Sequence, residues 1–342
     1  MVKSLPGCLL RLIFKFIRIQ FRYADNHSDL CGNYFGIQMK RTYHICISGG
    51  NELLCRDEED YVRCFNCLAM ACAETESILL ADSVMSNHLH ECVRTSSLNL
   101  LIEKQRYKYS RYFNAKYGRR GRLGEKTPFV IELQGLYHTL AALSYVLRNP
   151  VHHGIAPTPF AYPHCSANVI FSQSLGHVTD TLLMPAHNIS AHLPSRKRCP
   201  EGYRMDKSGL ILREDVIDTV DVEHMFGTAR AFLYYMNRLS GEEWKREQER
   251  DREHYAPITI ETIENGITLQ TMEQMLRNEH GRNDYRTMDD RKLCHLIDNT
   301  ILPRKGIGSV YQLPHEVKAA IARELLSEYR LPENQIRRCL AF

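Results

Sequence analysis

The sequence predicts an α+β protein built on an antiparallel sheet of ferredoxin-like βαββαβ order, followed by a mostly helical C-terminal extension. From residue 40 onward, strand and helix patterns succeed one another in that order. A short polar turn at Ser86 and Asn87 separates two strand patterns, and Pro150 follows a long helical pattern. This succession is typical of a split βαβ sheet with its helices on one face.

The individual elements follow from hydrophobic periodicity. Tyr43, Ile45 and Ile47 alternate in the first strand, and a leucine recurs at helical spacing from Leu136 to Leu147 in the last helix. Strands are predicted at 41–48, 78–85, 88–94 and 127–133, and helices at 57–74, 97–117 and 136–149. The strand at 88–94 is expected in the centre of the sheet.

The composition is that of a soluble globular protein of one or two domains: 342 residues, of which 44% are hydrophobic and 25% charged. The net charge of +4 argues against a protein coated in cations, although local clusters matter more to a polyanionic partner. The 12 cysteines are scattered, which favours a reducing, cytoplasmic compartment. Cys64 and Cys67 have no second CxxC, so packing is preferred to zinc binding.

Residues 1–39 are predicted to be a loose N-terminal extension or a mis-annotated start, with translation beginning at Met39. The apolar stretch at 8–21 is interrupted by Arg11, Lys15 and Arg18 and lacks a cleavage site. No membrane partner is therefore expected.

Two further regions follow the predicted domain at 40–165, whose end is marked by several prolines. Residues 166–285 are expected to be mixed and mostly helical, with a helix at 222–239 and a charged run at 242–253 that indicates a solvated helix face. No role is assigned to this region.

Residues 286–342 are predicted to be helical, with helices at 288–299, 314–329 and 332–340. The last two resemble a helix-turn-helix that would turn Asn334, Gln335, Arg337 and Arg338 outward to DNA. A plain helical hairpin for packing or dimerisation is the alternative.

Two pairs of residues indicate chemistry. His88 and His90 are two apart on a strand, so both imidazoles project to one face and can reach one metal ion. Tyr145 and Asn149 are four apart on a helix and share a face, provided that the turn before Pro150 stays regular. The expected metal ligands are His88, His90 and Asn149, and Tyr145 is the candidate nucleophile, although by itself it would be read as a half-buried helix residue.

The stretches that contain these pairs are Met85-Ser86-Asn87-His88-Leu89-His90 and Tyr145-Val146-Leu147-Arg148-Asn149-Pro150-Val151-His152-His153-Gly154. They resemble, in this order, the two motifs of the single-tyrosine HUH transposases, most closely the REP-associated tyrosine transposases. The resemblance covers about residues 40–165 and implies the HUH endonuclease fold. Ser86 replaces the usual proline, and Glu91 replaces an aliphatic residue, so Glu91 is expected at the rim or paired with a base.

The resemblance implies cleavage and rejoining of single-stranded DNA through a 5′-phosphotyrosine, at hairpin-forming repeats. A phenol with a pKa near about 10 needs a nearby acceptor or cation to act as a nucleophile. Two imidazoles alone would favour zinc, copper, iron or nickel, whereas the resemblance implies Mg²⁺ or Mn²⁺. Relatives include monomers and domain-swapped dimers, so both a monomer and a homodimer stay open.

Basic residues interleaved with tyrosines from 106 to 122 predict a grip on DNA, because cations neutralise phosphates and rings stack on bases. The alternative is an amphipathic helix with packed tyrosines and solvated cations. With the two C-terminal arginines, the predicted DNA-binding residues are Arg106, Lys108, Arg111, Lys116, Arg119, Arg120, Arg122, Arg337 and Arg338.

Two rival functions remain open at this point. The first is a domesticated, non-catalytic HUH domain that binds structured nucleic acid as a regulator. The second is a metal-dependent hydrolase that uses water instead of tyrosine, for which a Tyr145→Phe variant would stay active.

Overall fold

The computed structural model describes residues 39–177, 180–194, 198–238, 241–251, 256–264, 288–329 and 331–342. Nearly all of the predicted N-terminal extension lies outside these residues. The described residues from 40 onward belong to one compact unit. Within the described ranges, we find no helix that is both long and apolar enough to cross a membrane.

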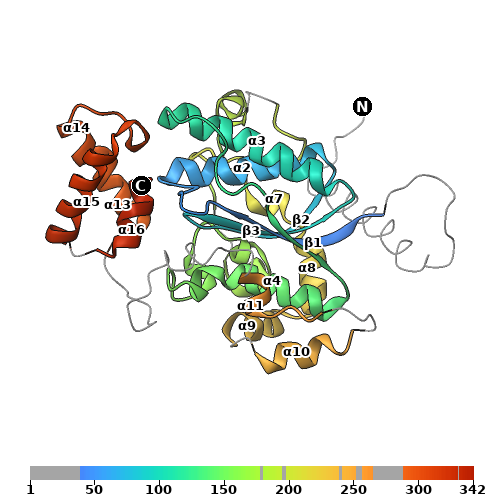
Figure 1. The fold of residues 1–342 in the computed structure, drawn as a ribbon. Helices are drawn as coiled ribbons and strands as arrows, with labels where there is room; N and C mark the ends of the chain where they lie inside the picture. Colours follow the sequence, from blue (N-terminus) through green and yellow to red (C-terminus); the bar gives the residue numbers. More distant parts are fainter. Residues whose placement is uncertain are drawn as a thin grey trace, which may run out of the picture. The chain divides into compact units, whose positions relative to one another are not determined.

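Four strands form one antiparallel sheet in the order β2-β3-β1-β4 (Figure 1). A mixed α/β fold with an antiparallel sheet is thus confirmed. The histidine strand β3 lies between β2 and β1, and nearly all its side chains are buried, so both its faces are covered. The strands are β1 (Arg41–Ser48), β2 (Ile78–Val84), β3 (His88–Thr95) and β4 (Phe129–Leu133).

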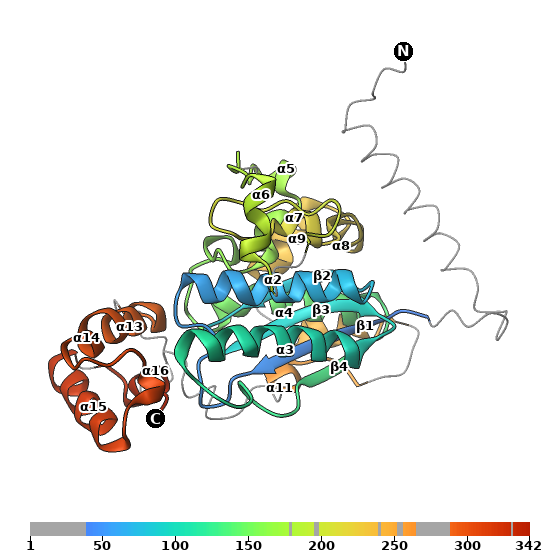
Figure 2. The ribbon, with the colours of Figure 1, turned by 90° about the horizontal axis from the view of Figure 1, so that it is seen from above.

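Two helices, α2 (Glu58–Glu74) and α3 (Leu98–Tyr117), lie side by side over one face of the sheet (Figure 2). A capping box starts α2, since the Asp57 carboxylate accepts from the Asp60 N–H at 3.1 Å and Asp60 accepts in return from Asp57. Leu89 of β3 and the helix residue Phe65 meet in this core. Cys64 and Cys67 of α2 are buried and unbridged in the same core, as their packing assignment predicted, and Cys72 is buried there too.

The opposite face is covered by α4 (Leu136–His152) and by helices of the region to which no role was assigned (Figure 1). The prediction of helices on one face only is therefore wrong. Leu143 of α4 packs in a second core with Phe232 and Trp244. The charged helix at 242–248 is thus not merely solvated, because Trp244 is 2% exposed.

The predicted helix at 222–239 is two helices, α8 (Thr219–Phe226) and α9 (Ala229–Asn237). They separate at Gly227, which has a φ of 78° that other residues rarely adopt. Shorter helices in this region are α5 (Ser172–Leu175), α6 (Ala186–Ile189), α7 (Arg213–Val216), α10 (Glu242–Gln248) and α11 (Ile260–Glu264), with 3₁₀ turns at Pro159–Ala161, Ser166–Val169 and Ser190–His192.

Helix α4 continues through Pro150 to His152, which corrects the expected stop at Asn149. Proline has no N–H, so Pro150 cannot donate the hydrogen bond to the carbonyl one turn earlier in the helix. The backbone hydrogen bonds that follow it are kept. The carbonyl of Asn149 accepts from the His153 N–H at 3.1 Å, and that of Pro150 accepts from the Ile155 N–H at 2.8 Å. The final turn is therefore regular enough to keep Asn149 on the same face as Tyr145.

The C-terminal helices share a core that includes Leu293, Ile321 and Ile336. Gln335 and Arg338 are 1% and 2% exposed, so the prediction that they face outward is wrong. The elements are α13 (Asp290–Leu296), a π-helical turn (Ile297–Ile301), α14 (Leu302–Arg304), a 3₁₀ turn (Val310–Gln312), α15 (His315–Tyr329) and α16 (Glu333–Cys339).

Candidate active site

The four residues predicted to carry chemistry meet between β3 and α4. The His88 Nε2 atom is 3.0 Å from Asn149 Oδ1, and the ring centroids of His90 and Tyr145 are 5.2 Å apart. All four side chains are buried, and Tyr145 is the most exposed of them at 3%. The strand contributes its histidines from one face, as the spacing predicts, and the helix contributes its pair from one side.

His88 faces an oxygen atom at each of its ring nitrogens. Its Nδ1 is 2.9 Å from Asn87 Oδ1, and its Nε2 faces Asn149 Oδ1. Burial lowers the pKa of His88 to about 4, so the ring is neutral near pH 7 and has one N–H to donate. If that proton lies on Nδ1, two lone pairs converge between His88 and Asn149. Two changes relieve the repulsion between these lone pairs: exchange of the oxygen and nitrogen positions of the Asn149 side-chain amide, or a cation bound between the two atoms.

His90 is held by a third histidine that was not predicted. His44 lies on β1, and its Nε2 is 2.9 Å from His90 Nδ1, so one ring donates to the other. The buried Nε2 of His90 has no hydrogen-bond partner among the described residues. Burial, and then the neighbouring histidines, lower the pKa of His90. A neutral ring with one unsatisfied nitrogen is the form in which histidine binds metal.

These donors fit a divalent cation. His88 and His90 each offer Nε2, and Asn149 offers an amide oxygen from the next layer. Across the described ranges, no group of three or more His, Cys, Asp or Glu side chains has metal-binding geometry. If a cation binds here, the Asn149 oxygen would be its third protein ligand, and it is a donor of the class that Mg²⁺ and Mn²⁺ prefer.

Tyr145 is surrounded by imidazole rings. Its ring lies edge-on to His90 and to His44, with centroids 5.2 and 6.4 Å away. Its hydroxyl makes no hydrogen bond of normal geometry with the described residues. Burial raises the pKa of Tyr145 well above 10, and the charges of Glu264 and Cys46 add to this, whereas the Asn149 amide lowers it. The phenol is thus protonated near neutral pH and needs a base to become a nucleophile.

Besides His44, sequence reasoning assigned no role to three residues around this site: His152, His153 and Glu264. The His153 ring lies 5.2 Å from that of His88, and His152 Nε2 contacts Glu264 Oε1 directly. The two histidines are adjacent to the Tyr145 motif in the sequence, but Glu264 comes from α11. No local pattern links α11 to Tyr145, so only the tertiary structure reveals the contact.

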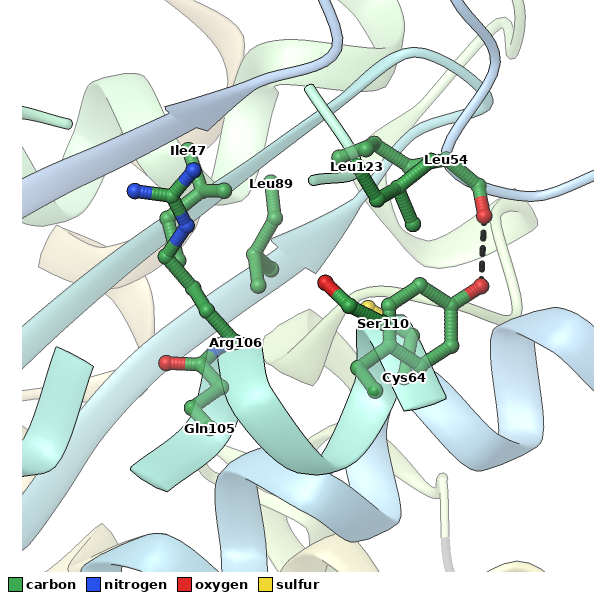
Figure 3. Close-up of a pocket in the computed structure, with 9 residues that line it drawn as sticks. Ile47, Leu54, Cys64, Leu89, Gln105, Arg106, Ser110 and Leu123 are labelled. Carbon is green, nitrogen blue, oxygen red and sulfur yellow. Dashed lines mark hydrogen bonds between the residues drawn. The ribbon is translucent and has the colours of Figure 1, made fainter. Parts of the chain in front are cut away.

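Glu91 lies on the other face of β3 and is completely buried, not at a rim as expected. Burial and then the charge of Asp82 raise the pKa of Glu91 to about 8. The Gln105 amide acts in the opposite direction and lines a cavity of about 20 Å³ with Leu89 and Ile47 (Figure 3). Glu91 is therefore separated from the four site residues by the sheet itself.

Most of the predicted DNA-binding cations are engaged within the protein. Lys116 lies 2.7 Å from Asp57 and 3.0 Å from Asp60, and Arg338 lies 2.6 Å from Asp290 in a buried pair. The others in this group are the pairs Lys108–Glu74 at 2.7 Å, Arg119–Glu52 at 2.5 Å and Arg337–Glu333 at 2.7 Å.

The remaining four cations are Arg106, Arg111, Arg120 and Arg122. Arg106 is half-buried and donates to the Lys126 carbonyl at 2.9 Å. Arg111, Arg120 and Arg122 are exposed, and Arg111 stacks on Tyr107, which is itself 61% exposed. Tyr109 and Tyr117 are buried in the core instead, as the packing alternative predicts for part of the tyrosines.

Comparisons with known proteins give little beyond this geometry. No model of a known protein family matches the sequence, and no curated protein matches it either. A solved structure described as a REP-associated tyrosine transposase bound to a REP hairpin is similar over 42% of this chain and 88% of its own, with 12% sequence identity and a TM-score of 0.35. A likeness at this TM-score does not establish a shared fold.

Proposed function

We propose that the protein cleaves and rejoins single-stranded DNA, with Tyr145 as the nucleophile. The supporting observation is that the Tyr145 hydroxyl, the His88 and His90 rings and the Asn149 oxygen lie together between β3 and α4, with the Nε2 of His90 unpaired among the described residues. A phenol, a cation site and neutral bases in one enclosed place are what phosphodiester transesterification requires.

In the proposed reaction the Tyr145 oxygen attacks the phosphorus of a phosphodiester. An O–P bond to tyrosine forms, the bond from phosphorus to the 3′ oxygen breaks, and the products are a 5′-phosphotyrosine and a free 3′-hydroxyl. A 3′-hydroxyl that attacks the phosphotyrosine reverses these bonds and rejoins the strand. A Mg²⁺ or Mn²⁺ ion bound by His88, His90 and Asn149 would polarise the scissile phosphate and offset its developing charge.

Access to this site requires movement. Tyr145 and both histidines are buried, so a phosphodiester reaches the phenol only after the elements around it separate. Outside the site, we expect the exposed side chains of Arg111, Arg120 and Arg122 to contact the DNA phosphates. The substrate we propose is a single strand next to a hairpin, whose unpaired bases would stack on Tyr107.

The test is incubation with a 3′-end-labelled single-stranded hairpin oligonucleotide and Mn²⁺, followed by a denaturing protein gel, because the fragment that carries the 3′ end is the one that stays on the tyrosine. The expected result is a DNA-linked protein band that is absent from Tyr145→Phe. Tyr137→Phe is the matched control, because Tyr137 lies on the same helix outside the site. Strand cleavage by Tyr145→Phe without an adduct would replace this proposal with a water-dependent hydrolase.

The closed site favours one alternative, a non-catalytic domain that binds structured nucleic acid. Tyr145 is 3% exposed, which suits a side chain that no longer meets substrate. This alternative predicts hairpin binding with no adduct and no cleavage, whether or not Mn²⁺ is present.

A further inference from the structure

A histidine–carboxylate pair lies beside Tyr145 and takes no part in the metal site described above. His152 Nε2 and Glu264 Oε1 are in direct contact, and the ring centroids of His152 and Tyr145 are 5.8 Å apart. His152 follows Tyr145 by seven residues on α4, so the two lie two turns apart on the same side of the helix.

Glu264 is held in place by packing. Ile258 and Ile263 are 1% and 0% exposed in the core below α4. The Gln248 side chain accepts from the Ile258 N–H at 2.7 Å and donates to its carbonyl at 2.8 Å. The side chains of His152 and Glu264 are 25% and 13% exposed, so water screens their interaction only partly.

The contact determines which histidine nitrogen is basic. A carboxylate accepts a proton donated by Nε2, which leaves Nδ1 of His152 as the acceptor and stabilises the imidazolium that forms on protonation. The same arrangement, with the nitrogens exchanged, orients histidine in serine hydrolases. Tyr145 needs such an acceptor, because its hydroxyl has no well-formed hydrogen bond among the described residues and must lose a proton to react.

We propose that His152, oriented by Glu264, accepts the proton of the Tyr145 hydroxyl as that oxygen attacks phosphorus. This inference rests on the proposed DNA cleavage. The phenolic proton moves to His152 Nδ1, the tyrosine–phosphorus bond forms, and the bond to the 3′ oxygen breaks. The 3′ oxygen takes a proton from water. In the rejoining reaction, protonated His152 returns its proton to the departing Tyr145 oxygen, and the attacking 3′-hydroxyl gives its proton to water.

Several charged or titratable groups face this pair. His88 and His90 approach from β3, Tyr145 lies on α4, His153 follows the end of α4, and Glu264 lies on α11. Burial, and then the negative charge of Glu264, raise the pKa of Tyr145. Glu264 touches no reacting atom in this scheme and is a positioning residue.

A purely structural role is the competing explanation, in which the pair only fastens α11 to α4. Glu264→Gln separates the two, because glutamine keeps an oxygen that accepts from Nε2 but removes the charge. The rate of phosphotyrosine formation is measured for the wild type, Glu264→Gln and His152→Ala at several pH values. Glu58→Gln is the matched control, since it removes a carboxylate 3.4 Å from His164.

The expected losses near pH 7 are about tenfold for Glu264→Gln and about 100-fold for His152→Ala, with no change for Glu58→Gln. Both losses shrink as pH rises, because hydroxide replaces the missing base. Added imidazole restores part of the His152→Ala rate. Wild-type rates in both variants, or losses that are the same at every pH and insensitive to imidazole, overturn the inference.

The two proposals fail in different ways. A wild-type protein that forms no adduct overturns DNA cleavage and this inference with it. A wild-type protein that forms the adduct, with variants that match it, overturns only the role of His152. If Glu264→Gln does not fold, as judged by circular dichroism, the imidazole response of His152→Ala decides alone.

Discussion

The two faces of the sheet bury polar groups in different ways. On the face under α2 and α3, the buried Asp60 carboxylate accepts from Tyr117 at 2.7 Å, from Tyr112 at 3.0 Å and from Lys116 at 3.0 Å. On the face under α4, the buried Nε2 of His90 and the hydroxyl of Tyr145 lack well-formed partners among the described residues. The first face has the properties of a structural core, and the second those of a site prepared for a ligand.

The face under α2 and α3 also buries two polar side chains that lack hydrogen-bond partners in the described part of the chain. Glu91 of β3 and Gln105 of α3 lie on this first face, and their side-chain polar atoms form no hydrogen bonds of normal geometry with the described residues. Their environment differs from that of the histidines, because burial keeps the Glu91 carboxyl protonated near pH 7 and its surroundings are mostly apolar. Unsatisfied polar atoms alone therefore do not define the site, which also needs a nucleophile and converging metal donors.

The largest expected effect is on the face under α4. His90→Ala removes one of the metal donors, and we expect adduct formation to fall by about 100-fold or more. The rate is measured with Mn²⁺ and the hairpin oligonucleotide. A variant that retains the wild-type rate would show that His90 does not take part in the reaction.

Leu89, next to His90 on β3, tests the face under α2 and α3. Leu89 is 1% exposed in the core under α2 and α3, and Leu89→Ala should lower the free energy of unfolding by about 2–5 kcal/mol. Urea denaturation measures this change. At a temperature where the variant is folded, its adduct rate should stay near that of the wild type. A stable variant that forms no adduct would break the division between the two faces.

The buried histidines predict acid sensitivity. Burial lowers the pKa of His44 to about 3 and that of His88 to about 4, below an unfolded value of about 6.5. The folded protein therefore binds fewer protons than the unfolded chain in this range, so stability is lost as pH falls from 6.5 toward 3.

Replacing one of these histidines should weaken that dependence. In the presence of a chelator, His44→Leu should show a smaller fall in the free energy of unfolding between pH 7 and pH 4 than the wild type. The difference is about 1–3 kcal/mol for a group shifted by this extent. Equal slopes in both proteins would mean that His44 titrates as it does in the unfolded chain.

The smallest expected effect is on DNA affinity when exposed arginine side chains are removed. Arg120 and Arg122 are exposed, and replacing both with Ala should reduce the slope of log affinity against log salt by about 1 for each DNA phosphate that is no longer neutralised. Lys116→Ala is the contrasting variant, because Lys116 is bound by carboxylates and should affect stability more than DNA affinity. Fluorescence anisotropy with the hairpin measures the affinities, and urea denaturation measures the stabilities. The opposite ranking of the two variants would relocate the DNA surface.

The sequence predicts the centre of the site well because that part is local. Two residues on one strand face and two on one helix face follow from backbone periodicity alone. His44 was also within reach, since the alternation of Tyr43, Ile45 and Ile47 places it on the other face of β1. Antiparallel pairing of β1 with β3 then brings it beside His90.

The errors come from contacts between distant parts of the chain. Strand periodicity does not tell what covers a face, so the helices after residue 166 that pack against α4 on the histidine side were not expected there. Nothing near Lys116 or Arg338 in the sequence identifies Asp60 or Asp290 as the carboxylate that holds it. Glu264 reaches His152 across 112 residues, which no spacing rule anticipates.

The most direct test of Tyr145 as the nucleophile is identification of the residue that carries the DNA. After reaction with the hairpin oligonucleotide and Mn²⁺, nuclease and protease digestion leave a peptide with a residual 5′-phosphonucleotide for mass spectrometry. We predict that the modification lies on Tyr145. A nucleotide attached to another residue, or cleaved DNA with no modified peptide, would contradict the proposed function.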